Sequence, residues 1–144
     1  MSFESPFGNS ITSEDIVDTL SFFDDWEERY KYIIDLGKEL PGMSDDKKTD
    51  EFLLRGCQSQ VWLHAEHENG KVKYTADSDA ILTKGLIALM IRVLSNHKPE
   101  EIVKADMSFI DEVGLKEHLS PTRANGLASM IKQMKFYALA LQAR

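Results

Sequence analysis

A change in the spacing of the apolar residues at the centre of the chain restricts its fold more than any other feature. Apolar and polar residues alternate over 61–65 and again over 71–75, which is the period of a half-buried strand. Between these runs stands Asn69-Gly70, a dipeptide favoured in two-residue turns between antiparallel strands. The sequence therefore predicts a β-hairpin of about 59–67 with 71–76.

Helical spacing dominates on both sides of this hairpin. Short helices are expected after Thr12 or Ser13, from Pro99, and over 107–113 up to Gly114. A longer helix is expected from near Asp24 to a stop at Gly37 and Leu40-Pro41-Gly42. Two more are expected, one over the apolar stripe that follows 77–79 and one from Ser120-Pro121 almost to Arg144. Gly85, inside the apolar stripe, predicts close approach of another element.

Together these elements indicate an α+β fold. We expect a small antiparallel β-sheet, made of the hairpin and a third strand near 52–54, packed against several α-helices. The 144 residues are expected to form one domain over 1–144, with 1–11 as a loose N-terminal arm.

Composition excludes several function classes. Hydrophobic residues make up 42% of the chain and charged residues 28%, as in soluble globular proteins. A net charge of −7 argues against a nucleic-acid or anionic-membrane partner. The apolar run 86–91 is far shorter than the ~20 residues that span a bilayer. With one cysteine and no export signal, we expect a cytoplasmic protein.

Cys57 is the only cysteine, so it has no internal disulfide partner. A zinc ion or iron–sulfur cluster usually needs about four protein ligands, which leaves chemistry that one thiolate can perform. Gly56 before it, and Gln58 and Ser59 after it, suggest an exposed bend. The opposing interpretation is a small buried side chain, the commonest fate of an unpaired cysteine.

The histidines do not select a catalytic partner for Cys57. A thiol hydrolase needs an imidazole within hydrogen-bond reach, and no spacing singles out one of His64, His67, His97 and His118. His64 and His67 have opposite parity on the expected strand, which disfavours a zinc site that joins them to Cys57. No metal and no bound cofactor is expected in this chain.

Four more polar residues are candidates with competing local interpretations. Asp77 and Asp79 are first interpreted as capping residues of the following helix, as is Ser120 for the last one. Arg123 and Asn125 lie in the first turns of that last helix, where Asn125 and the next residue, Gly126, are poor helix formers.

Several of these residues lie in segments that resemble the SufE family of sulfur acceptors. The matching segments occur in the family's order and spacing over roughly 20–135: WEERY at 26–30 with YIIDLG at 32–37, GCQSQVW at 56–62, DSDA at 77–80 followed by KGLIA at 84–88, and LSPTR at 119–123 with NGL at 125–127.

The resemblance implies a SufE/IscU-like fold and a role in iron–sulfur cluster assembly. Cys57 would accept persulfide sulfur from a pyridoxal-phosphate-dependent, SufS-like cysteine desulfurase, stimulate that enzyme, and pass the sulfur to a SufBCD-like scaffold. The pyridoxal phosphate (PLP) belongs to the partner. Gly56, Gln58 and Ser59 would form the loop and its hinge. A rim for docking the partner would comprise Asp77, Asp79, Arg123 and Asn125.

Two other functions stay open at this stage. Cys57 could serve a small thiol enzyme, a hydrolase or a peroxide reductase, that acts without a protein partner. It could also be inert in a pure interaction module. The sequence does not choose between a monomer and a homodimer.

Overall fold

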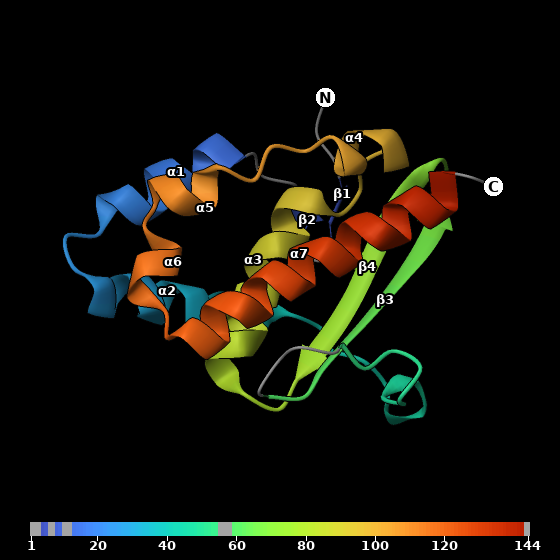
Figure 1. Cartoon of the computed structure of the whole chain (residues 1–144), viewed down its shortest axis with the longest axis horizontal. Helices are drawn as coiled ribbons and strands as arrows, with labels where there is room; N and C mark the ends of the chain where they lie inside the picture. Colours follow the sequence, from blue (N-terminus) through green and yellow to red (C-terminus); the bar gives the residue numbers. More distant parts are fainter. Residues whose placement is uncertain (1–3, 6–7, 10–12, 55–58, 143–144) are drawn as a thin grey trace.

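The computed structural model describes residues 4–5, 8–9, 13–54 and 59–142. In chain order the elements are β1 (Glu4–Ser5), β2 (Gly8–Asn9), α1 (Ser13–Phe22), α2 (Trp26–Glu39), the 3₁₀ turn η1 (Asp45–Lys47), β3 (Val61–Glu68), β4 (Lys71–Ser78), α3 (Ile81–Leu94), α4 (Pro99–Val103), α5 (Phe109–Glu112), α6 (Leu115–His118) and α7 (Pro121–Gln142). The hairpin β3–β4 lies at one end of the molecule, and α1, α2, α5 and α6 gather at the other (Figure 1). Helix α7 runs across the molecule between the two ends (Figure 1). The predicted α+β class is confirmed.

The hairpin forms as the sequence predicts. Strands β3 and β4 are antiparallel, with register from Val61 opposite Ser78 to Glu68 opposite Lys71. Asn69 (φ 54°) and Gly70 (φ 79°) both adopt positive φ, which the tight turn between two right-twisted strands requires. Each strand extends one or two residues beyond the predicted end.

The expected third strand is not formed in the described part of the chain. Segment 52–54 makes only an isolated bridge, between Leu53 and Trp62. Two hydrogen bonds support it, from Leu54 N–H to Val61 O (2.7 Å) and from Leu63 N–H to Phe52 O (2.9 Å). Turn-type bonds back to Thr49 and Asp50 begin immediately before the bridge, so this segment is too short for a strand. The only other described sheet is the short pair β1–β2 near the N-terminus.

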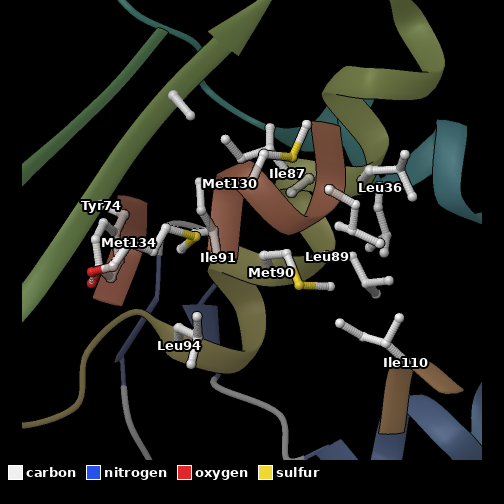
Figure 2. Close-up of a cluster of buried hydrophobic side chains, with 14 of the residues drawn as sticks. Leu36, Tyr74, Ile87, Leu89, Met90, Ile91, Leu94, Ile110, Met130 and Met134 are labelled. Atoms are coloured by element: carbon white, nitrogen blue, oxygen red, sulfur yellow. Dashed lines mark hydrogen bonds between the residues drawn. The ribbon is translucent and has the colours of Figure 1, made fainter. Parts of the chain in front are cut away.

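Helix α3 forms the centre of the core. Nine of its fourteen residues are buried, so it is apolar on nearly every side. Figure 2 shows Ile87, Leu89, Met90, Ile91 and Leu94 of α3 beside Met130 and Met134 of α7, with Leu36, Tyr74 and Ile110 around them. The Tyr74 hydroxyl donates a hydrogen bond to the Met134 carbonyl and so joins β4 to α7.

A glycine pair sets the distance between α2 and α3. A Cβ built on Gly85 would lie 2.3 Å from Ile33 O, and one on Gly37 would lie 2.7 Å from Gly85 N. The predicted close approach at Gly85 is confirmed. The predicted stop of the second helix at Leu40-Pro41-Gly42 is confirmed, because α2 ends at Glu39 with Leu40 as its C-cap. Gly37 itself stays inside the helix, where it is the contact point for α3.

Candidate functional site

The candidate site surrounds the segment that carries the only thiol. Cys57, Gly56 and Gln58 lie outside the described residues, as does Arg55. Ser59 is described, and so are both flanks of the segment. The site is therefore built from those flanks and from the residues that contact them.

Both flanks are held at the base of the hairpin. Leu54 is buried, with 8% of its surface exposed, and its N–H donates to Val61 O. On the other flank, Gln60 N–H donates to Asp79 Oδ1 at 3.0 Å. Gln60 O accepts from the Ser78 hydroxyl at 2.8 Å and from Asp79 N–H at 3.3 Å. Leu54 and Gln60 thus lie side by side at fixed positions, and Cys57 lies between them in sequence.

These bonds change the interpretation of the 77–79 segment. Helix α3 begins at Ile81, and its N-cap residue Ala80 makes no side-chain capping bond. The interpretation of Asp77 and Asp79 as helix caps is therefore wrong. Asp79 binds the Gln60 backbone instead, so its carboxylate helps to hold the flank of the thiol segment.

Asp77 lies in a cluster of charges beneath this base. Only 7% of its surface is exposed, and its carboxylate lies 3.0 Å from Lys48 Nζ and 3.3 Å from Lys84 Nζ. The N–H groups of Met43 and Ser78 also donate to it, at 3.3 Å and 2.8 Å. Burial alone would raise the pKa of Asp77, but these hydrogen bonds, led by that from Lys48, hold the pKa below its ordinary value. Asp77 thus joins the 43–48 loop to β4 and α3.

The other candidates for the rim are exposed. Asp79, Arg123 and Asn125 are all open to solvent, and the last two lie in the first turns of α7. The Ser120 hydroxyl accepts from Arg123 N–H at 3.3 Å, which confirms Ser120 as a helix cap. Burial raises the pKa of Tyr30, and the positive charge of Arg123 opposes that rise, so Arg123 acts on α2 as well.

A small cavity brings two of the predicted residues together. It has a volume of about 30 Å³, the size of a single water molecule, and is lined by Ser59, Thr83, Leu86, Thr122, Arg123, Gly126 and Met130. Ser59 and Arg123 are far apart in sequence but meet here. The cavity combines hydroxyl groups and a guanidinium with apolar walls directly beside the flank of the thiol segment.

Sequence reasoning missed several of these partners. Lys48 lies in a charged loop without periodicity, and Lys84 lies on a helix whose apolar stripe gives no sign of an ion pair. Thr83 and Thr122 come together only through the packing of α3 against α7. The single usable signal was the density of polar residues at 77–79, which indicated that this segment has partners.

No metal centre is evident in the part of the chain that the structure describes. There, no group of three or more His, Asp or Glu side chains gathers where an ion could bind. His64 and His67 face opposite sides of β3, as expected. His118 stacks on Trp26 with ring centroids 4.0 Å apart, and its Nδ1 lies 2.9 Å from Gly114 O. No helix among the described residues is long and apolar enough to cross a bilayer.

The fold defines a known class of small α+β protein. The solution structure of a hypothetical protein from Thermus thermophilus superposes with a TM-score of 0.77 over 92% of this chain and 96% of that one. The two sequences are only 19% identical, so this similarity concerns the fold.

Sequence relatives make the assignment specific. A SufE-like protein of Rhizobium meliloti is 43% identical over 131 residues, which cover 87% of this chain and 94% of that protein. A second from Rhizobium etli is 40% identical over 127 residues, with 85% and 86% covered. The family model of SufE, the Fe-S metabolism associated domain, matches residues 14–138. The chain therefore belongs to the SufE family, and its domain is one associated with iron–sulfur metabolism.

Proposed function

We propose that this protein accepts sulfur from a cysteine desulfurase onto Cys57 and delivers it to an iron–sulfur cluster scaffold. One observation carries the proposal: the only thiol of the chain lies in GCQSQVW at 56–62, inside the region 14–138 that the SufE model matches. The family's association with iron–sulfur metabolism is consistent with a desulfurase as partner.

The chemistry is a thiol exchange that one cysteine can perform. The Cys57 thiolate would attack the terminal sulfur of a persulfide on the desulfurase. A sulfur–sulfur bond would form at Cys57 while the bond within the enzyme's persulfide breaks, and the enzyme's cysteine would leave as a thiolate. No electrons are gained or lost overall, so the step needs no oxidant and no cofactor in this chain. Removal of sulfur from the enzyme would also speed its turnover.

The surroundings of the segment support this role in two ways. The bonds at Leu54 and Gln60 hold both flanks of the thiol segment at one place, which favours presentation of Cys57 to a macromolecule. Arg123 and Asp79 are exposed beside one flank and provide charges for docking a protein, and the exposed amide of Asn125 lies in the same first turns of α7 as Arg123. Thiolates are stabilised by nearby positive charge, and Arg123 brings one to the cavity that Ser59 also lines.

The test is sulfur transfer followed by intact-mass spectrometry. After incubation with a SufS-like desulfurase, PLP and free cysteine, we expect the protein to gain one sulfur atom, mapped by peptide analysis to Cys57. Cys57→Ser should gain none and should no longer stimulate the desulfurase, while its unfolding midpoint matches that of the wild type. Ser59→Ala is the matched control, because it changes a neighbouring hydroxyl and leaves the thiol.

Three outcomes would contradict the proposal. The first is an unmodified wild-type protein in the presence of an active desulfurase. The second is full stimulation of the desulfurase by Cys57→Ser, which would make the thiol inert. The third is turnover of a small thiol or peroxide substrate without any desulfurase, which would indicate a free-standing thiol enzyme.

A further inference from the structure

The two outer edges of the hairpin differ in how far they are covered. On β4, Val72 N–H donates to His97 O (2.8 Å), Asn96 N–H donates to Val72 O (2.7 Å), and Tyr74 N–H donates to the Ser95 hydroxyl (3.2 Å). That edge is closed by the segment after α3. On β3, only the first half is covered, by the 52–54 bridge.

The register shows which groups remain free on β3. The two-residue turn makes Glu68 and Lys71 a hydrogen-bonded pair, so even-numbered residues of β3 bond to β4 and odd-numbered ones point outward. Leu63 follows this rule, because its N–H donates to Phe52 O and its carbonyl accepts from the Tyr137 hydroxyl at 3.2 Å. Ala65 and His67 have no such bond to any residue in 13–54 or 59–142. Their N–H and C=O groups form an open strand edge, and Figure 1 shows no element of the described chain beyond it.

A cavity lined by both apolar and polar residues adjoins Leu63, the last covered residue before this open edge. It has a volume of about 390 Å³ and lies between the 51–54 segment and the outer side of α7. Leu63, Phe52, Phe136 and Tyr137 are among its lining residues. Phe136 lines this cavity and is 61% exposed, and Leu139, one turn further along α7, is 53% exposed, so α7 carries uncovered apolar side chains at the cavity and beyond it. The cavity is large enough for a branched aliphatic or aromatic side chain.

A second copy of this chain fits the open edge poorly. Antiparallel pairing of two β3 edges would place Ala65 opposite His67 in both hydrogen-bonded pairs, and Glu66 directly opposite Glu66 in the close pair between them. Like charges directly opposite each other destabilise a sheet. Glu66 already has Lys47 Nζ at 3.6 Å and His64 Nδ1 at 3.8 Å, but its side chain is still 55% exposed and favours a positive residue opposite it.

From this geometry we propose that β3 binds an extended segment of another protein as an added strand. Its backbone pairs with Ala65 and His67, a lysine or arginine stands opposite Glu66, and the neighbouring apolar side chain enters the cavity at Phe136 and Tyr137. The bound segment should alternate basic and apolar residues, because side chains of a strand point to opposite faces in turn and those opposite Ala65 and His67 point toward α7. This interaction is separate from sulfur transfer and does not depend on Cys57.

The test uses an acetylated peptide of alternating valine and lysine residues, titrated into the isotope-labelled protein. We expect amide hydrogen exchange to slow at Ala65 and His67, together with chemical-shift changes at Phe136 and Tyr137. A peptide of the same length with glutamate in place of each lysine should bind more weakly because of Glu66. His67→Pro removes one outward N–H without touching the ladder to β4, so binding should weaken about fivefold, the effect of one lost hydrogen bond. His67→Thr, which keeps the N–H, should bind like the wild type.

The proposal is overturned by any of four results. The first is no slowing of exchange at Ala65 and His67 with millimolar peptide, and the second is equal binding of the valine–glutamate peptide. The third is unchanged peptide binding by a His67→Pro protein whose hairpin is intact. The fourth is protection of both amides in the free protein that rises with protein concentration. The last would identify a second copy as the natural occupant. The intact-mass assay at Cys57 reports on the proposed function independently of all four.

Discussion

The carboxylate of Asp77 receives two lysine side chains and two backbone N–H groups while almost none of its surface is exposed. Four donors around one buried carboxylate stabilise its ionised form more than water does. Gly42 lies against the same group, since a Cβ there would approach Asp77 Oδ2 to 2.9 Å. Asp77 therefore joins the 42–48 loop to β4 and α3, and its expected place at a docking rim stays a prediction.

Replacement of Asp77 by asparagine should lower the free energy of unfolding by about 2 kcal/mol at neutral pH, because charge-assisted hydrogen bonds are lost. The folded-state pKa of Asp77 is depressed, so the wild type has this contribution in full above the unfolded pKa of about 4. The contribution disappears as the pH falls through the lower folded pKa. Urea unfolding of both proteins across acid pH would measure it.

The two stability curves should converge at acid pH. Asp79→Asn is the matched control, because Asp79 is exposed and accepts a backbone bond without a lysine. A difference between wild type and Asp77→Asn that stays constant down to the lowest pH would contradict the assignment of the ion-pair cluster as its cause.

At the scale of elements, the crossing of α2 and α3 depends on two residues that have no side chain. Local propensity treats Gly37 and Gly85 as weak points of their helices. In the fold they are the places where one backbone reaches the other, and the gain from the packing of two core helices outweighs the loss in propensity. Contact between backbones at this distance is possible only with glycine.

Gly85→Ala should destabilise the protein by about 3 kcal/mol, since the new methyl group meets the Ile33 carbonyl and the two helices must separate. Gly70→Ala provides the comparison. Nothing lies within 4 Å of a Cβ at Gly70, so only its positive φ opposes alanine, at a cost of about 1 kcal/mol. Equal losses of stability in urea for the two variants would show that α2 and α3 do not need this close contact.

At the scale of the whole molecule, α3 and α7 connect the hairpin end to the helical end. Helix α3 packs on α2, on β4 and on α7, and α7 also contacts α4, α6 and both strands of the hairpin. Because the buried side chains of Figure 2 form one continuous cluster, neither end has a separate core. Unfolding of either end should therefore expose the other.

Amide hydrogen exchange provides the test of this unity. The amides of Ile87, Leu89 and Ile91 should exchange only through global opening, with the free energy that urea unfolding gives. Amides of η1, where no residue is buried, should exchange through local opening at much lower free energy. Fast exchange in α3 while β3 and β4 stay protected would instead show two independently stable parts.

Much of this architecture was predictable because it depends on neighbouring residues. The Asn69-Gly70 turn, the alternation in β3 and β4, Pro99 at the start of α4 and the Ser120 cap of α7 follow from backbone preferences within a few residues. The single thiol and the SufE-like segments around it were also evident in the chain itself.

Tertiary structure decided what depends on distant residues. Asp79 binds Gln60 rather than capping α3, and Gly37 continues α2 rather than ending it. Segment 52–54 forms a bridge rather than a strand. In each case a partner from another element determines the outcome. The open edge at Ala65 and His67 follows from the same cause. Whether a backbone group on a strand edge is hydrogen-bonded depends on which distant segment packs beside it, and the neighbouring residues in the sequence do not determine this.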